Sequence, residues 1–428
     1  MNIIKKILGA NDIVKVLRIK PFLNLMLSEF FSQTAFNMQH FVIIFIIYEV
    51  FKSNTAVSGV ILSFTIPSII FSVLAGVYVD RWDKKKVLFY TNFLRAILLL
   101  FFLIPNLHLA AIYGVTFLLA VATQFFLPAE APMIPNLVKK DLMVSANSIF
   151  GVGIFVTVLI GYIVSGPLLL ILGRSYTFIL LSLLFFISAV FILLIPSSKK
   201  VKDNQVLGDG VGESIIIEIK EVFAFMKKAK KVSTSLILLT FSQTILFVFA
   251  VLGPGYMSQI LYVRVESLSW ILLAPAAAGM IVGSLTIGTL SKKISLHTAI
   301  TIGFLLEGLV FIFLPHGSRV ESYRIVQTLN EHLPRFLDIN ILHIIMFSAF
   351  LAGLGNSLIF IPANTTIQTH TTEEFRGRVY GLLNALVGAV SLIPVAAAGG
   401  LADILGVGTV LGGLGFLLFI TGIFRFFF

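Results

Sequence analysis

Long apolar segments follow one another along the whole chain, separated by short polar stretches. Each is 16–27 residues long, close to the roughly 20 residues that a helix needs to cross a bilayer. The pattern therefore predicts an all-α membrane protein with twelve transmembrane helices. We place these at 23–48, 56–79, 87–104, 109–127, 146–172, 176–195, 235–261, 268–290, 299–314, 341–360, 379–401 and 407–424.

The two halves of the chain resemble each other. Phe-Ser-Gln-Thr occurs at 31–34 and again at 241–244, and Pro-Ala at 128–129 and again at 362–363. Two parallel six-helix repeats are a transporter architecture. We therefore predict an N-terminal bundle at 1–196, a cytoplasmic linker with an amphipathic helix at 197–232 and a C-terminal bundle at 233–428.

Composition supports a membrane protein and excludes several other classes. The 428 residues are 58% hydrophobic and 12% charged, whereas a soluble domain carries about 25% charged residues. Cysteine is absent, so no disulfide or thiolate metal site exists, and we expect neither a metal nor a cofactor. No nucleophile, acid pair or ATP-binding loop stands out, which disfavours an enzyme or a primary pump.

The basic residues predict the orientation. Of the 31 lysines and arginines, 24 fall on the side of the termini, six on the other side and one, Arg95, inside a span. Because Lys and Arg collect in cytoplasmic loops, both termini should be cytoplasmic. The net charge of +11 then reflects topology, and we expect no nucleic-acid partner.

A charged turn at 76–85 follows the second segment and reads Gly-Val-Tyr-Val-Asp-Arg-Trp-Asp-Lys-Lys. Gly76 would let two helices approach closely. Asp80 could accept hydrogen bonds from the start of the eleventh helix, since a helix N-terminus favours an anion. We predict a cytoplasmic gate, with a loop that only sets topology as the alternative. The gate would comprise Gly76, Asp80, Arg81, Lys84, Lys85, Arg376 and Arg378.

This turn resembles the signature loop of the major facilitator superfamily, although Asp83 stands where a glycine is commoner. Together with Pro-Ala at 128–129, Ile-Pro-Asn-Leu-Val at 134–138, Ala-Asn at 146–147 and Gly-Arg-Val at 377–379, it looks most like the macrolide-efflux and siderophore-exporter branch of drug/proton antiporters. The resemblance implies the major facilitator fold and alternating access. Gly161, Gly166 and Pro167 resemble the helix 5 motif of these antiporters, but the fourth segment lacks their usual arginine.

A narrow polar stripe runs along the first helix. Glu29, Gln33, Asn37 and His40 span about 80° of the helical wheel at roughly 100° per residue, so they should face protein or water rather than lipid. Helices 1, 4, 7 and 10 line the cavity in the family, which favours a substrate site over interhelical hydrogen bonding. For His40, a role in packing fits equally well. Weaker cavity candidates on the other three helices are Gln124, Ser242, Gln243 and Asn356.

Glu29 and Glu307 are the candidates for proton coupling. A carboxylate whose surroundings change between two conformations can take up a proton on one side of the membrane and release it on the other. The rival interpretation for Glu29 is a static ion pair with Arg95. Arg95 itself is expected to meet Glu130 or Glu29, or to extend its charge to the cytoplasmic face. Arg95 and Glu307 occupy equivalent positions, 212 residues apart.

The sequence thus predicts a secondary transporter that exports an amphipathic organic molecule with the proton gradient, as a monomer in a bacterial inner membrane. A strongly anionic substrate is disfavoured because the stripe holds one acid and no arginine cluster. A lipid transporter of the same fold or a non-transporting sensor are the alternatives.

Overall fold

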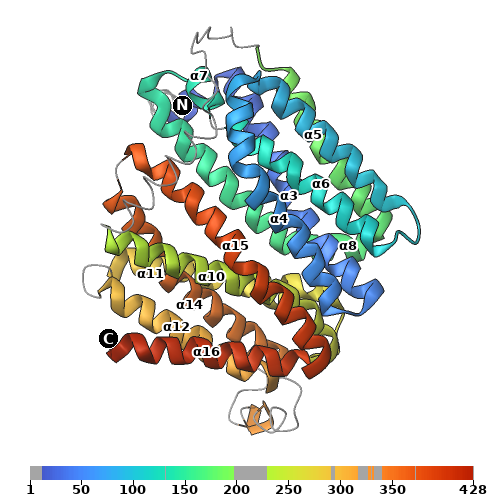
Figure 1. Ribbon diagram of the computed structural model, residues 1–428, viewed down its shortest axis with the longest axis vertical. Coiled ribbons are helices and arrows are strands. Elements are labelled where there is room, and N and C mark those ends of the chain that lie inside the picture. The colour runs from blue at the N-terminus through green and yellow to red at the C-terminus, as the bar shows by residue number, and fades with distance from the viewer. Residues whose placement is uncertain are drawn as a thin grey trace. The chain divides into compact units, whose positions relative to one another are not determined.

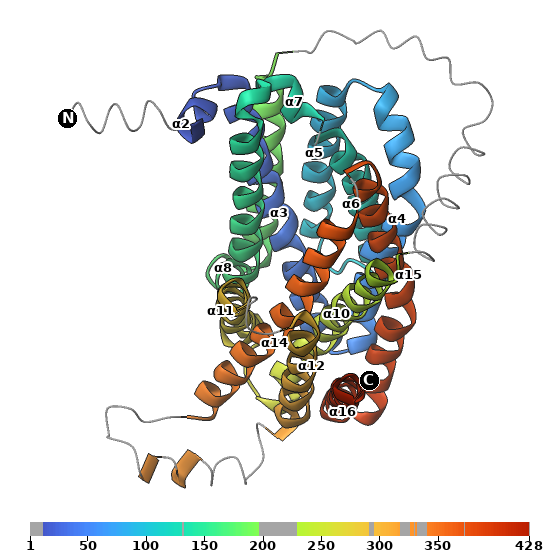
Figure 2. The same cartoon turned by 90° about the vertical axis from the view of Figure 1, so that its left-hand side faces the viewer.

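The computed structural model describes residues 12–130, 132–196, 229–290, 295–316, 326–328, 330–331, 340–371 and 373–427. Throughout these residues the regular structure is helical, without a strand (Figures 1 and 2). Most of the linker predicted at 197–232 lies outside the described residues. The helices are α2 (Asp12–Leu17), α3 (Lys20–Phe51), α4 (Asn54–Arg81), α5 (Lys84–Leu100), α6 (Leu109–Glu130), α7 (Met133–Leu137), α8 (Met143–Leu193), α10 (Lys230–Gly255), α11 (Ala274–Leu290), α12 (Leu296–Phe313), α14 (Ile341–His370), α15 (Glu373–Leu405) and α16 (Val407–Phe427).

Short turns of tighter or wider helix extend or connect these elements. They are η1 (Phe101–Leu103), η2 (Lys140–Leu142), η3 (Tyr256–Ile260), η4 (Val265–Ser267), η5 (Ser269–Leu273) and η6 (Leu314–His316). Two of them, η3 and η5, are single π-helical turns on either side of the α10–α11 connection.

The predicted twelve-span, all-α fold is confirmed. Eleven helical stretches of the described residues are long and apolar enough to cross a membrane. The longest, 145–193, contains two spans, because Gly173 at φ 70° and ψ 177° breaks the helix there. A left-handed φ of this kind suits glycine, and the predicted ends at 172 and 176 fall on either side of it.

Several helices extend beyond their predicted ends, and the largest difference is at the end of the tenth span. The tenth span was expected to end at 360, but α14 continues through Pro362 to His370. Membrane helices tolerate such internal prolines because side chains and local adjustments satisfy the backbone groups that proline leaves free. α6 likewise runs through Pro128 to Glu130, which extends it beyond the predicted end at 127.

The described chain forms two compact units, which we treat separately. Unit 1 contains 1–46 and 62–202, and unit 2 contains 47–61 and 203–428. In unit 1, α5 packs against α6 and α8. In unit 2, α12 packs between α14 and α16, and α10 packs against α14 and α15 (Figure 1). The short segment 47–61, which joins α3 to α4, is therefore grouped with the second half of the chain.

Large apolar side chains remain on the outer surface of both units. Ile171, Ile393 and Ile404 are each about 80% exposed. Many other large apolar side chains of the described residues are exposed as well, and a lipid environment matches such a surface. These side chains explain where much of the 58% hydrophobic composition lies.

Candidate functional site

The polar stripe predicted on the first helix lies on α3 as expected, but its members differ in burial. Glu29 is 3% exposed, while Gln33, Asn37 and His40 are half-buried. The side-chain amide of Asn37 donates to the backbone oxygen of Gln33 at 2.8 Å. The stripe is thus most enclosed at Glu29.

Asn37 is a helix-packing position. A Cβ built at Gly161 of α8 would collide with the Cβ of Asn37, so the two helices touch at this point. Small residues permit this kind of close approach in membranes. This contact explains the glycine at 161, although the hydrogen bond of Asn37 stays within α3. Gly166 and Pro167 lie about one and a half turns further along α8.

His40 is held among aromatic rings. Its Nδ1 lies 2.6 Å from the backbone oxygen of Phe36, and since a carbonyl only accepts, Nδ1 carries the proton. Its ring centroid lies 4.5 Å from that of Phe36 and 3.9 Å from that of Phe64. These contacts favour the packing interpretation of His40.

A buried group of charged side chains lies at the other end of the stripe, inside unit 1. Glu29 of α3, Glu130 of α6 and Arg95 of α5 are 3%, 5% and 1% exposed. Both carboxyl groups act electrostatically on Arg95, yet these three residues form no ion pair within 4.0 Å. The guanidinium carbon instead lies 4.4 Å from the ring centroid of Phe126 and 4.9 Å from that of Phe185. We call Glu29, Glu130 and Arg95 the unit 1 charge cluster.

The unit 1 charge cluster is incompletely hydrogen-bonded. Neither carboxyl oxygen of Glu29 has a well-formed hydrogen-bond partner, and the Nη2 of Arg95 has none either. The side chain of Glu29 nevertheless lies beside those of Gln33 and Glu130. The Nε of Arg95 donates to the backbone oxygen of Thr91 at 3.3 Å. Buried polar atoms without partners are rare and costly, so they mark a place where protons, water or a ligand can act.

A network of neutral polar side chains includes residues of α3 and α5, the helices that carry Glu29 and Arg95. Ser32 donates to Asn92 at 3.0 Å, Asn92 donates to Ser188 at 2.8 Å, and Ser28 and Ser188 share a hydrogen bond of 2.8 Å. All four are buried and they join α3, α5 and α8. The sequence analysis did not select them, although two serines at i and i+4 on one helix were a visible signal.

A different arrangement occupies the interior of unit 2. Glu307 of α12 is 2% exposed and interacts with the amide of Asn356 on α14. Asn356 in turn donates to Ser242 of α10 at 3.0 Å. Glu307 fits because Gly355 has no side chain, since a Cβ there would lie 3.0 Å from the Cγ of Glu307. We call Glu307, Asn356 and Ser242 the unit 2 polar triad.

The structure thus links two of the weaker cavity candidates, Ser242 and Asn356, to the coupling candidate Glu307. The other two, Gln124 of α6 and Gln243 of α10, are half-buried. Glu130 was known from the sequence only as a possible partner of Arg95. The structure places it inside α6, because that helix continues past Pro128.

The predicted cytoplasmic gate is only partly described. The side chains of Asp80, Arg81, Arg376 and Arg378 lie outside the described residues, so the gate stays a prediction. Of the rest of the set, Lys84 and Lys85 open α5, and Lys85 donates to the backbone oxygen of Leu193 at 2.9 Å.

The structure describes the surroundings of two further residues of this turn, Gly76 and Asp83. Among the described residues, no heavy atom lies within 4 Å of a Cβ built at Gly76, so the close approach expected there is not seen. Asp83 begins α5, and its side chain accepts from the N–H of Lys86 at 3.3 Å. An acidic residue at this position is a common helix cap, which explains why it can replace the usual glycine.

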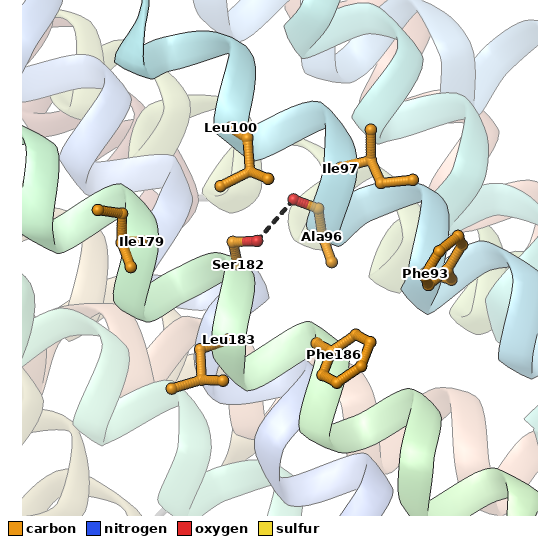
Figure 3. A pocket seen from close by; sticks show the side chains of 8 residues that line it. All are labelled: Phe93, Ala96, Ile97, Leu100, Ile179, Ser182, Leu183 and Phe186. Atoms are coloured by element: carbon orange, nitrogen blue, oxygen red, sulfur yellow. Dashed lines mark hydrogen bonds between the residues drawn. The ribbon is translucent and has the colours of Figure 1, made fainter.

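A surface groove of about 330 Å³ runs between α5 and the second half of α8 (Figure 3). Its polar feature is Ser182, which donates to the backbone oxygen of Ala96 at 2.7 Å. Six of its lining side chains are 37–49% exposed, so the groove opens outward and is not an enclosed substrate site. The lining residues are Phe93, Ala96, Ile97, Leu100, Ile179, Ser182, Leu183 and Phe186. Among the described residues, no group of three His, Asp or Glu side chains is placed to hold a metal.

Comparisons with known proteins agree with this architecture. The sequence profile of the Major Facilitator Superfamily matches residues 25–326 and 232–428. The chain is 23% identical to the uncharacterized MFS-type transporter YfiS of Bacillus subtilis (strain 168), over 88% of this chain and 85% of that protein. It is 23% identical to the uncharacterized MFS-type transporter YfmI of the same organism, over 95% and 96%. The crystal structure of the nucleoside transporter NupG superposes with a TM-score of 0.71 at 15% identity, covering 96% of this chain and all of that one.

Proposed function

The chain belongs to the Major Facilitator Superfamily, and we propose that it is a proton-coupled exporter of an amphipathic organic molecule. Members of the family are transporters rather than enzymes, and the many apolar helices make this a multi-pass membrane protein. The finer assignment, to the macrolide-efflux and siderophore-exporter branch, is part of the proposal. It is supported by the sequence motifs described above and by one feature of unit 1.

That feature is the unit 1 charge cluster, which carries the proposal of proton coupling. Two carboxylates and one guanidinium leave one net negative charge inside a membrane protein, where an unbalanced charge is expensive. One proton shared by Glu29 and Glu130 makes the cluster neutral. Its release restores the negative charge, which water or a cationic substrate can then offset.

This charge balance suggests a simple exchange. The cluster takes up a proton when it opens to the outside and loses it when it opens to the cytoplasm, while substrate moves the other way. Because proton uptake and substrate release occur in the same conformational cycle, the free energy of the proton gradient drives export of the substrate. Arg95 keeps the pair from carrying two uncompensated charges and is a positioning residue in this scheme.

The substrate class follows from what the polar stripe contains. One acidic residue with neutral amides and aromatic rings suits an amphipathic neutral or cationic molecule better than an anion. We further propose a monomer in the bacterial inner membrane, with both termini in the cytoplasm. The nucleoside transporter NupG shares the fold at 15% identity, which gives no ground for assigning a nucleoside to this chain.

The test is transport in inside-out vesicles that contain the purified protein. A screen of amphipathic compounds by thermal stabilisation supplies the probe, with ethidium as the first organic cation to try. Uptake driven by an acidic interior and exchange without a gradient are measured side by side. The variants are Glu29→Gln and Glu130→Gln, and the matched control is Glu49→Gln, an exposed acid on the same helix as Glu29.

We expect Glu29→Gln to keep exchange and to lose gradient-driven accumulation, because an amide cannot carry the proton. Glu49→Gln should behave like the wild type in both assays. Full accumulation by both Glu29→Gln and Glu130→Gln would refute coupling through this cluster.

A further inference from the structure

Asp403, near the C-terminal end of α15, binds the beginning of α4 within unit 2. The backbone N–H groups of Asn54 and Thr55 donate to its two carboxylate oxygens at 2.8 and 3.0 Å. The hydroxyls of Ser53 and Thr55 donate at 2.7 Å each, and the side-chain amide of Asn54 at 2.9 Å. One carboxylate thus accepts five hydrogen bonds from three consecutive residues.

Asp403 caps the first turn of α4 although it belongs to another helix, α15. The first N–H groups of a helix lack intrahelical partners and carry partial positive charge. Asp403 satisfies two of them in α4, and the hydroxyl of Ser53 accepts a third, from Ala56 at 3.2 Å. In its own helix Asp403 stands in the last turn, where the helix dipole disfavours an acid. Its position is therefore explained by the contact with α4 and not by local helix preference.

The backbones of α4 and α15 are packed closely beside this contact. Val395, Gly399 and Asp403 follow one face of α15 at intervals of four residues. Ser58 donates to the backbone oxygen of Val395 at 2.8 Å, and a Cβ at Gly399 would collide with the Oγ of Ser58. Glycine at 399 thus allows the beginning of α4 to lie directly against α15, with Asp403 at the end of the contact.

The segment that Asp403 holds is a short piece of the first half of the chain. Residues 47–61 group with 203–428, whereas 12–46 and 62–196 belong to unit 1. Asn54 is 0% exposed, and a Cβ at Gly255 of α10 would collide with it. In the predicted topology, the turns at 52–53 and at Gly406 both face outward.

We propose that Asp403 is a latch that holds the outward end of the transporter closed and is released when the protein opens outward. The inference rests on the proposed function, since alternating access requires that 47–61 separate from α15 in one state. It also gives α4 and α15 reciprocal roles. Asp80, at the C-terminal end of α4, is predicted to bind the start of α15, and Asp403, at the C-terminal end of α15, binds the start of α4.

A labelling experiment tests the latch without substrate or gradient, so failure of the export proposal does not affect it. The chain contains no cysteine, and Ala56 is 4% exposed, so Ala56→Cys provides a single buried reporter. The rate at which a membrane-impermeant maleimide labels it is measured in right-side-out vesicles. The background carries Asp403→Asn, Thr55→Val or both, and Glu49→Gln is the matched control because it removes an exposed acid from the same segment.

We expect Asp403→Asn to raise the labelling rate about tenfold or more, since the loss of a single charge-assisted hydrogen bond can shift an equilibrium that far. Thr55→Val should raise the rate less, and the double variant should match Asp403→Asn alone, because both residues act in one contact. Thr55 is exposed, so its variant remains informative if Asp403→Asn folds poorly. Labelling of Asp403→Asn and Thr55→Val at the rate of Glu49→Gln would overturn the proposal, and so would fully additive effects.

Discussion

The interiors of the two units share a helical plan and differ in the charged residue at one equivalent position. Arg95 and Glu307 stand 212 residues apart at equivalent places, as do Ser32 and Ser242 at 210. In each unit the serine on the first helix of the repeat binds an asparagine, but Asn92 lies on the third helix of its repeat and Asn356 on the fourth. The charged residue at the equivalent position is Arg95 in one unit and Glu307 in the other, so its sign is reversed.

That difference changes what surrounds each site. A buried cation requires counter-charge, and unit 1 supplies two carboxylates and two aromatic rings around Arg95. Glu307 interacts with the amide of Asn356, and one of its oxygens and the Oδ1 of Asn356 lack partners. The hydroxyl of a protonated Glu307 could donate to the Oδ1 of Asn356, which lacks a donor. The comparison teaches that the two halves share a helical plan, while each builds its own serine–asparagine hydrogen bond and its own charged interior on that plan.

Removing Arg95 should produce the largest effect. Arg95→Leu leaves two buried carboxylates without a cation, and we expect the free energy of unfolding to fall by about 3–5 kcal/mol. The equivalent change in unit 2, Glu307→Leu, removes a partner of the Asn356 amide but leaves no buried charge behind, so we expect a smaller loss of about 1–3 kcal/mol. Thermal unfolding of both variants in one detergent checks this, and equal losses would contradict the comparison.

The two serines should differ by a smaller amount. Ser242→Ala leaves the Nδ2 of Asn356 without its hydrogen bond, which should cost about 1–3 kcal/mol. Ser32→Ala leaves Asn92 still bound to Ser188, so we expect the lower end of the range, about 0.5–1.5 kcal/mol. The same unfolding assay measures both, and a larger loss in Ser32→Ala would show that the networks are not organised as described.

Glu307→Gln should have the smallest effect. Glutamine can still bind the amide of Asn356, so gradient-driven accumulation in vesicles should persist while Glu29→Gln loses it. The exposed control Glu49→Gln calibrates the assay. If instead Glu307→Gln abolishes accumulation and Glu29→Gln does not, proton coupling belongs to unit 2.

Much of the fold could be predicted from the chain because its cause is local. The lengths of the apolar segments predicted the number of spans, and the left-handed φ of Gly173 fits the break predicted between 172 and 176. The narrow polar stripe correctly indicated that Glu29 would be enclosed. The errors concern positions where neighbours override local preference, such as α14 continuing through Pro362.

The site was less predictable because it depends on how helices rotate against each other. The spacing of 212 residues showed that Arg95 and Glu307 occupy equivalent positions. It did not show that Arg95 lies over Phe126 and Phe185. Asn37 shared the stripe with Glu29, yet its contact with Gly161 belongs to packing. A helical wheel shows which residues share a face and leaves open which helix meets that face.

By itself, the sequence determined that this is a twelve-span membrane protein built from two related halves, because hydropathy and helix length act residue by residue along the chain. Only the tertiary structure decided which polar groups meet, placing Glu130 beside Glu29 and Asp403 on the first turn of α4. These contacts depend on close backbone approach and on helix rotation, which arise when all helices pack together and which no one-dimensional pattern contains.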